Sequence, residues 1–203
     1  MNIIEVRADE KALLHAVTAV HMETFPGFFL TFMGKGFLQK MYLSYCEYGE
    51  ATLLAAVEDG RVLGFLAYAC DMSGLYKYMI RHHLFAFARY SAGAFFRKPS
   101  VFMRLLRAFL KPSETKREEA YVELASIGTA PAAKQRGIGT ALIDALKARV
   151  DFAKYAYITL ETDAVDNEAV NRFYQKNGFA LARTYETREG RKMNEYRYRK
   201  GDA

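Results

Sequence analysis

The chain has 203 residues, 51% of them hydrophobic, which is enough to bury the core of one domain and too apolar for a disordered tail. The net charge of +6 is uneven: residues 72–118 carry ten Lys or Arg against two acidic residues, so this segment is at +8 and the remainder at −2. Because the basic charge lies in one patch and no recognition module is apparent, we expect no nucleic-acid partner.

Cys46 and Cys70 match no metal-ligand spacing, so we expect no metal site. Residues 1–5 are charged too early for a signal peptide, and no apolar run is long enough to span a membrane. We therefore expect a reduced, cytoplasmic protein, although the sequence alone leaves a disulfide open.

The apolar patterns of the first seventy residues predict a strand at about 3–7 and helices at about 10–23 and 36–48. They then predict a hairpin whose two strands lie at about 51–57 and 62–69. Asp59-Gly60, between the last two runs, is typical of a hairpin turn. Residues 28–33 are apolar and fit either a helix or a strand.

Residues 72–118 are rich in both aromatic residues and arginine, and helices at about 74–90 and 99–110 fit this segment. We interpret it as a helical insertion within a single domain spanning 1–203. Three roles stay open for it: a lid over a substrate site, a homodimer contact, and binding to an anionic membrane surface. A lid would favour a large or anionic acceptor, such as a sugar-nucleotide amine.

The second half alternates strands and helices, and we predict these elements at about 120–129, 140–150, 155–161, 167–177, 179–186 and 192–199. In the strand 120–129, simple alternation places Glu123, Ala125 and Ile127 on one face. The whole order predicts an α/β domain with a mixed, mostly antiparallel sheet flanked by helices, in which two βα units form a local parallel pair.

The stretch 127–142 runs from a strand through a proline and Gly137-x-Gly139 into a helix. The backbone amides from Gln135 to Thr140 would lie unpaired at the helix N-terminus, where they can bind phosphate groups. The stretch has neither the P-loop signature nor the third glycine of a dinucleotide fingerprint. Glu161 lies near the distance expected of a ribose-binding acid, which keeps a dinucleotide site open.

Two motifs resemble those of the GNAT superfamily of N-acetyltransferases. Residues 129–139, Thr-Ala-Pro-Ala-Ala-Lys-Gln-Arg-Gly-Ile-Gly, resemble its acetyl-CoA loop, with Thr129 in an apolar place and Lys134 in an Arg/Gln place. Residues 167–179, Asn-Glu-Ala-Val-Asn-Arg-Phe-Tyr-Gln-Lys-Asn-Gly-Phe, resemble its second pattern, with Val170 replacing an alanine. Residues 72–118 have no counterpart in the minimal pattern.

The resemblance implies direct transfer of an acetyl group from acetyl-CoA, as co-substrate, to an amine of a small molecule or peptide. It assigns CoA binding to the stretch Ile127, Gly128 and Thr129, to the loop Lys134, Gln135, Arg136, Gly137, Ile138, Gly139 and Thr140, and to Asn167 and Tyr174. The Ile127 amide is the candidate oxyanion donor, and Tyr174 matches the tyrosine that serves the leaving sulfur.

Glu123 occupies the place of a general base in histone-type members, and a carboxylate beside apolar neighbours suits that duty. Glu161, Asp163, Glu23 and His21 are rival bases, although for His21 and His15 we expect positions on a helix surface. Two alternatives to this enzyme stay open. One is a non-catalytic acyl-CoA-binding or regulatory module, and the other is an acyltransferase held at a membrane by the insertion.

Overall fold

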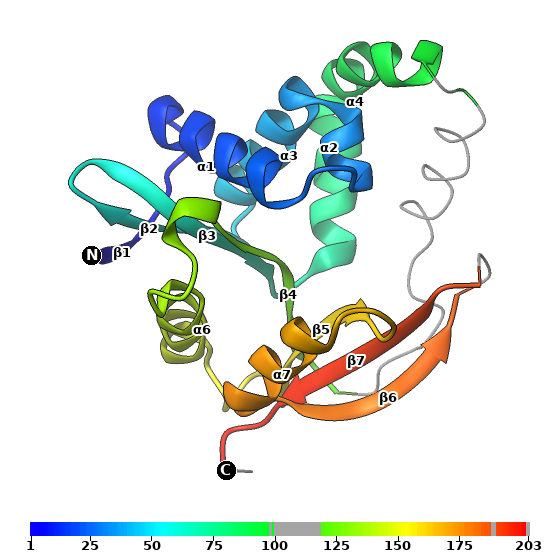
Figure 1. The fold of residues 1–203 in the computed structure, drawn as a ribbon. Coiled ribbons are helices and arrows are strands. Elements are labelled where there is room, and N and C mark those ends of the chain that lie inside the picture. The colour runs from blue at the N-terminus through cyan, green and yellow to red at the C-terminus, as the bar shows by residue number, and fades with distance from the viewer. Residues whose placement is uncertain (98, 100–118, 188–189, 202–203) are drawn as a thin grey trace.

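The computed structural model describes residues 1–97, 99, 119–187 and 190–201 (Figure 1). One seven-stranded sheet, in the order β1-β2-β3-β4-β5-β7-β6, forms the centre. Its strands are β1 (Asn2–Glu5), β2 (Ala51–Glu58), β3 (Arg61–Ala69), β4 (Tyr121–Thr129), β5 (Tyr157–Asp163), β6 (Ala180–Glu186) and β7 (Lys192–Tyr198). The helices are α1 (Lys11–Thr24), α2 (Phe29–Met33), α3 (Lys35–Glu47), α4 (Met72–Arg97), α6 (Ile138–Arg149) and α7 (Glu168–Lys176), with a 3₁₀ turn η1 (Pro131–Ala133).

The helices form two layers, with α1 to α4 on one face of the sheet and α6 and α7 on the other (Figure 1). Strands β2 and β3 are therefore covered on both sides, which explains their continuous apolar runs. Leu53 and Ala55 pack with the first layer, whereas Leu54 and Ala56 pack with the second. The predicted fold class, a mixed and mostly antiparallel sheet flanked by helices, is confirmed.

Strands β4 and β5 are parallel neighbours that part after a short contact. Their pairing covers only Tyr121, Val122 and Glu123 of β4, and it ends where Glu123 meets Thr159. Beyond that point β4 stays paired with β3 as far as Thr129, while β5 stays paired with β7 as far as Asp163. Within the described residues, the edge of β4 from Leu124 to Thr129 that faces β5 therefore has no strand partner.

A β-bulge in β4 corrects the predicted alternation. The register shifts so that Tyr68 of β3 faces Leu124 while Ala67 faces Ser126, and Ala125 is left out of the pairing. Ile127 consequently packs with the same apolar cluster as Leu124. The prediction that Glu123 and Ile127 share a face was wrong, because one extra residue reverses the side on which every later side chain lies.

The remaining differences concern the ends of elements. Residues 28–33, left ambiguous by the sequence, contain the short helix α2, and α6 begins two residues before the predicted start at Thr140. Helix α4 runs further than the predicted 74–90. The second predicted helix of the insertion, about 99–110, lies outside the described residues beyond position 99. Among the helices that are described, none has the length and apolarity needed to cross a bilayer.

Candidate active site

The loop between β4 and α6 presents backbone amides at a helix N-terminus. Gln135 (φ 64°) and Gly137 (φ 74°) have left-handed backbone conformations that turn the chain into the helix. The first backbone bond of α6 runs from the Ala141 N–H to the Gly137 carbonyl, so the amides of residues 138–140 have no acceptor within the helix. These amides sit at the positive end of the helix dipole, which suits an anion such as a pyrophosphate.

The side chains of this loop are mostly exposed, and one of them is ion-paired. The Arg136 guanidinium lies 2.6 Å from a Glu58 carboxylate oxygen at the end of β2. That hydrogen bond lowers the pKa of Glu58 below its ordinary value. Lys134, Gln135 and Thr140 are exposed to solvent. The main hydrogen-bond donors of the loop are therefore its backbone N–H groups, and Glu58 holds the Arg136 guanidinium beside them.

The two glycines of the loop serve different purposes. Gly137 has open space around it and is required by its positive φ. Gly139 is required by packing, because a Cβ there would lie 2.9 Å from the Phe173 ring of α7. Gly139 thus lets α7 approach α6 closely, and this approach positions Tyr174, the next residue of α7.

Tyr174 is a buried aromatic side chain beside the sheet. It is 7% exposed, and its ring packs tilted or edge-on against Phe173, Phe179 and Tyr196. Burial raises the pKa of Tyr174, so the phenol keeps its proton at neutral pH. Within the part of the chain that the structure describes, its hydroxyl has no hydrogen-bond partner. A protonated, unpaired phenol is able to donate a hydrogen bond to an incoming group.

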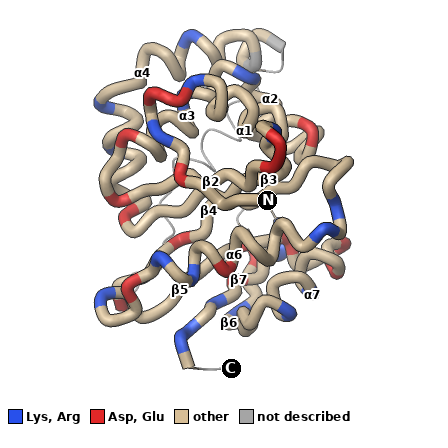
Figure 2. The backbone as a smooth tube through the Cα atoms, turned by 90° about the vertical axis from the view of Figure 1, so that its left-hand side faces the viewer, with Lys and Arg blue, Asp and Glu red and all other residues tan. Residues whose placement is uncertain are grey.

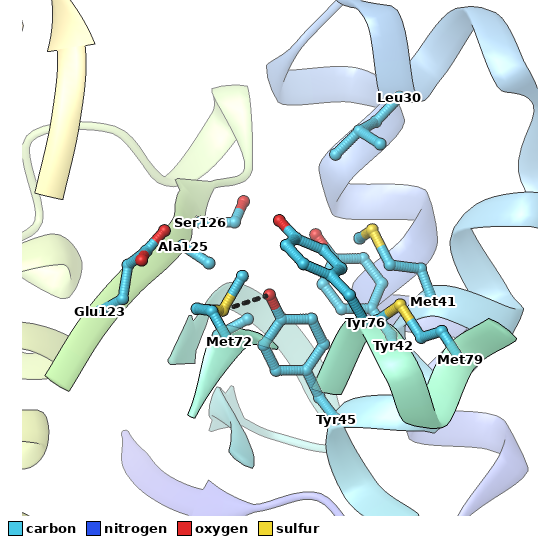
Figure 3. Close-up of a pocket in the computed structure, with 11 residues that line it drawn as sticks. Leu30, Met41, Tyr42, Tyr45, Met72, Tyr76, Met79, Glu123, Ala125 and Ser126 are labelled. Carbon is cyan, nitrogen blue, oxygen red and sulfur yellow. Dashed lines mark hydrogen bonds between the residues drawn. The ribbon is translucent and has the colours of Figure 1, made fainter. Parts of the chain in front are cut away.

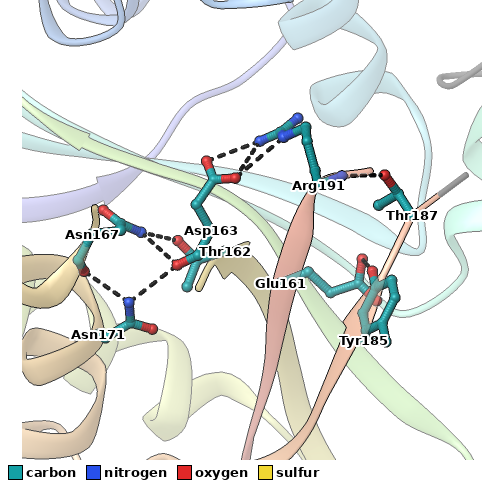
Figure 4. A network of polar contacts seen from close by, with 8 residues as sticks. All are labelled: Glu161, Thr162, Asp163, Asn167, Asn171, Tyr185, Thr187 and Arg191. Carbon is teal, nitrogen blue, oxygen red and sulfur yellow. Dashed lines mark hydrogen bonds and ion pairs between the residues drawn. The ribbon is translucent and has the colours of Figure 1, made fainter. Parts of the chain in front are cut away.

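A polar network ties the start of α7 to the end of β5 (Figure 4). The Asn167 side-chain amide donates to Thr162 Oγ1 at 2.8 Å and to the Asp163 carbonyl at 3.1 Å. Asn167 occupies the N-cap position of α7 but makes no side-chain cap hydrogen bond, because its amide is turned toward β5 instead. Asn171 reinforces the tie by donating to the same Asp163 carbonyl at 3.1 Å.

Three of the four rival bases are either engaged or exposed. The Asp163 carboxylate forms a two-point ion pair with Arg191, at 2.7 and 2.9 Å, and a Glu161 oxygen accepts the Tyr185 hydroxyl at 2.7 Å (Figure 4). Glu23 lies exposed near the end of α1.

His21 was expected on a helix surface, and this was wrong. It is 3% exposed, and burial lowers its pKa to about 4. His21 Nδ1 lies 2.6 Å from the Tyr42 hydroxyl, and its Nε2 has no partner among the described residues. Ser126 lies close enough to Tyr42 to oppose the rise in its pKa that burial causes, so His21, Tyr42 and Ser126 place polar groups between α1 and the bulge of β4. His15, by contrast, is exposed as predicted.

A cavity of about 130 Å³ lies against the bulge of β4 (Figure 3). β4 contributes Glu123, Ala125 and Ser126, and the helices α3 and α4 supply most of the opposite wall. That wall is rich in two residue types: the tyrosines Tyr42, Tyr45 and Tyr76, and the methionines Met41, Met72 and Met79. The N-terminal half of the predicted insertion therefore forms part of the cavity wall.

Glu123 is half-buried at the mouth of the β4–β5 gap. Its charge adds to the effect of burial in raising the pKa of Tyr45 and of Tyr76, so the three side chains lie close enough to interact. Figure 3 shows the two tyrosines extending from the helices toward β4. The structure thus brings one carboxylate and several phenols to the place where β4 loses its partner.

The described residues contain no group of His, Cys, Asp and Glu side chains suited to hold a metal ion. The sequence named the loop as a candidate through its strand–turn–helix pattern, and Glu123 through its resemblance to histone-type members of the family. It gave no sign of the cavity wall. The spacing by four of Phe37, Met41 and Tyr45 in α3 was visible, but nothing local indicates that the same face also meets α4 and β4.

The comparisons with known proteins concern the family and the fold. The profile of the Acetyltransferase (GNAT) family matches residues 14–179. An acetyltransferase of the GNAT family from Desulfovibrio desulfuricans is 17% identical, with a TM-score of 0.62 and 98% of each chain covered. A ribosomal-protein-alanine N-acetyltransferase from Brucella melitensis is 16% identical, with a TM-score of 0.62, and the match covers 98% of this chain and 99% of that one.

An aminoglycoside 6'-acetyltransferase type Ii has the same fold, with 16% identity, a TM-score of 0.62 and coverage of 98% and 97%. The comparison with curated protein sequences returns no match. Since the family profile spans most of the sequence, the chain belongs to the GNAT family and is a GNAT-type N-acetyltransferase, a family that uses acetyl-CoA as co-substrate.

Proposed function

We propose that this enzyme transfers the acetyl group of acetyl-CoA directly to a primary amine of a small molecule or peptide. The observation that carries the proposal is the parting of β4 and β5. The gap ends at the amides of α6 on one side and borders the cavity beside Glu123 on the other. One stretch of β4 can therefore hold the donor while the acceptor approaches from the cavity.

In this proposal the donor lies along the open edge of β4. The Ala130 N–H donates to the Leu63 carbonyl of β3. Because successive strand amides point to alternate edges, the N–H groups of Ile127 and Thr129 point away from β3, toward the gap. The Thr129 carbonyl already accepts the Thr24 hydroxyl at 3.0 Å, so the two amides are the main groups available to the pantetheine arm and the thioester.

The remaining donor contacts follow from the loop. The amides of residues 135–140 would bind the pyrophosphate, with Lys134 and Arg136 adding positive charge beside it. Asn167 is held against β5 by its bonds to Thr162 and Asp163, so its contribution to CoA binding would require its carbonyl oxygen or a shift of its side chain.

The chemistry needs a base, an oxyanion donor and a proton for the leaving sulfur. Glu123 takes a proton from the ammonium group of the acceptor, and the free amine attacks the thioester carbonyl carbon. The Ile127 amide stabilises the oxyanion of the tetrahedral intermediate. When the carbon–sulfur bond breaks, Tyr174 donates its proton to the thiolate, and the second proton lost by the attacking nitrogen restores the Tyr174 phenol. The products are an N-acetyl amine, CoA and the proton that Glu123 took, which passes to solvent.

The test separates catalysis from binding. We expect Glu123→Gln to lower kcat by roughly 100-fold, as is usual for loss of a general base, and Tyr174→Phe to lower it by about tenfold or more. Acetyl-CoA affinity should stay unchanged in both. Thiol release from acetyl-CoA gives the rate, and calorimetry gives the affinity. Glu161→Gln, which alters the rival carboxylate, should keep most of the rate.

The same variants test the non-catalytic alternative. A regulatory acyl-CoA-binding module would bind acetyl-CoA, release no thiol with any amine, and show no difference between wild type and Glu123→Gln. If instead Glu161→Gln abolished turnover while Glu123→Gln did not, the base would be Glu161 and our assignment would be wrong.

We further propose that the enzyme is cytoplasmic, which the two free thiols, Cys46 and Cys70, support. The surface of helix α4 indicates which partners the protein could bind. The helix carries four basic residues and no acidic one (Figure 2), and its outer face exposes Phe85 (89%) and Phe96 (79%). A second copy of the chain and an anionic membrane are the two occupants that such a face suits. Light scattering and co-sedimentation with anionic vesicles distinguish them.

A further inference from the structure

The wall of the cavity beside Glu123 has a distinctive composition. Methionine and tyrosine side chains form most of it, and Glu123 is the one charged residue among the described residues that line it. The described residues of this lining include no Lys or Arg, although α4, which supplies part of it, carries four basic residues. A phosphate or carboxylate on the acceptor would therefore meet no opposite charge from the described lining, and it would meet the carboxylate of Glu123.

The size of the cavity limits what can enter. Its volume is about 130 Å³. An apolar protein cavity of roughly 150 Å³ binds a benzene molecule, so this one accommodates a phenyl ring or a branched alkyl group of similar size. A hexose with its hydroxyl groups would place polar atoms against methionine side chains that offer them almost no hydrogen bonds.

The polar end of the cavity suits a cation. Glu123 lies where β4 loses its partner, and Tyr45 and Tyr76 extend toward β4 from the opposite wall (Figure 3). A carboxylate pairs with an ammonium group, and tyrosine faces attract cations. The apolar methionines Met41 and Met79, both nearly fully buried, lie deeper in the wall. The arrangement orients a molecule with its ammonium toward β4 and its apolar part toward the helices.

From these observations we infer the acceptor class: a primary amine joined by a short linker to one compact apolar group, such as a phenyl ring or a branched alkyl chain. The inference rests on the proposed acetyl transfer and narrows its acceptor. It also departs from the large or anionic acceptor that a lid suggested from the sequence. The apolar group can belong to a free amine or to the first side chain of a peptide.

The first experiment measures kcat/KM by thiol release for a panel of amines on the wild-type enzyme. The panel holds 2-phenylethylamine, 3-methylbutylamine, ethanolamine, glucosamine, and two tetrapeptides that begin with Phe or Ser. Burying the apolar group should favour the first two amines over ethanolamine and glucosamine by at least about tenfold. Whether the free amines or the Phe peptide give the higher value identifies the source of the apolar group.

Equal or higher values for ethanolamine or glucosamine would overturn the acceptor class and leave acetyl transfer standing. No thiol release with any member of the panel, from enzyme that binds acetyl-CoA, would overturn the acceptor class and the proposed function together. Loss of acetyl-CoA binding itself would be a failure of the donor site, which calorimetry detects separately.

The second experiment tests the two ends of the cavity. N,N-dimethyl-2-phenylethylamine, a cation that cannot form a stable amide, should compete with the acceptor at a concentration at least about tenfold lower than neutral 2-phenylethanol. Met79→Ala, at the deep end of the wall, should enlarge the cavity there and raise the ratio of kcat/KM for 2-(1-naphthyl)ethylamine to that for 2-phenylethylamine by about fivefold. Ile80→Ala, on the exposed face of the same helix, should leave this ratio unchanged.

Equal inhibition by the two analogues would contradict the cationic end, and an unchanged ratio in folded Met79→Ala enzyme would contradict the apolar end. If Met79→Ala does not fold, the wild-type panel and the pair of inhibitors still decide both points.

Discussion

At the scale of single residues, the account depends on Gly137 as the left-handed residue that aims the α6 amides. We expect Gly137→Glu to weaken acetyl-CoA binding by at least about tenfold, because its carboxylate would face the pyrophosphate. Two unit charges 4 Å apart interact by about 1 kcal/mol in water and about 4 kcal/mol near a protein surface. Calorimetric titration with acetyl-CoA gives the affinity.

Gly137→Ala is the matched control. A Cβ at this position meets no atom within 4 Å, so alanine adds only the strain of a positive φ, roughly 1 kcal/mol. Its affinity for acetyl-CoA should stay within a few-fold of wild type. If Gly137→Ala weakened acetyl-CoA binding as much as Gly137→Glu does, backbone geometry rather than charge repulsion at the anion site would explain the lost affinity.

His21 gives a prediction about pH. Its folded pKa of about 4 lies below the unfolded value of 6.5, so below pH 6.5 the unfolded chain takes up a proton that the folded protein does not. Stability is therefore full above pH 6.5 and falls as the pH drops from 6.5 to about 4. We expect the free energy of unfolding to fall by about 2 kcal/mol between pH 7 and pH 5 because of this residue.

Urea unfolding of wild type and His21→Gln at both pH values measures the effect, and the difference in pH dependence between the two belongs to His21. His15→Gln, which changes an exposed histidine on the same helix, should keep the wild-type pH dependence. Identical pH dependence in wild type and His21→Gln would show that burial of His21 is not responsible.

Single residues also show which features of the site could be predicted from the sequence and which could not. Gly137 was predicted because a strand, a G-x-G turn and a helix leave a local pattern, and Glu123 was predicted because it occupies the place of a base in histone-type members of the family. The burial of His21 was not, because it depends on Tyr42, Phe25 and Phe65, and two of these lie far from it in the chain. A histidine at a helical position has the same local pattern whether the rest of the fold covers it or not.

At the scale of elements, the packing of β3, β4 and α6 positions the donor site. Gly64 of β3 lies beneath the first residue of α6, and a Cβ there would lie 2.9 Å from both the Gly128 carbonyl oxygen and the Ile138 side chain. Because the first of these atoms is backbone, the two strands must separate to make room. We expect Gly64→Ala to lower the free energy of unfolding by about 1–3 kcal/mol and to weaken acetyl-CoA binding.

Gly49→Ala is the control for the same substitution, because a Cβ at Gly49 meets nothing within 4 Å. It should change the free energy of unfolding by no more than about 0.5 kcal/mol. Denaturant titration of the two variants measures both values. Equal stability of Gly64→Ala and wild type would mean that the contact between β3, β4 and α6 is not close-packed.

The elements themselves were largely predictable, whereas their registers were not. Hydrophobic periodicity located the strands and most helices to within a few residues. The bulge at Ala125 depends on how β3 and β4 pair, and alternation within β4 alone cannot reveal it. For that reason the sequence placed Ser126 on the wrong side of the strand and missed its place beside Glu123 in the cavity.

At the scale of the whole molecule, our proposal divides the two substrates between the two halves of the fold. The second half, with β4, α6 and α7, carries the proposed donor loop and Tyr174, and the first half, with α3 and the start of α4, supplies most of the proposed acceptor wall. The two halves meet along β4. One edge of β4 stays paired with β3, whereas the edge that faces β5 loses its pairing after Glu123. The acceptor wall thus comes from the part of the chain that least resembles the family pattern.

The most direct test of the central claim is hydrogen exchange with and without acetyl-CoA. Our account predicts that acetyl-CoA slows exchange of the amides of Ile127 and Thr129 and of residues 135–140. The strand β6 (180–186), which contributes nothing to the proposed donor site, should exchange at an unchanged rate. Binding of acetyl-CoA with no protection at either segment, or with protection only elsewhere, would contradict the claim that the donor lies in the gap between β4 and β5.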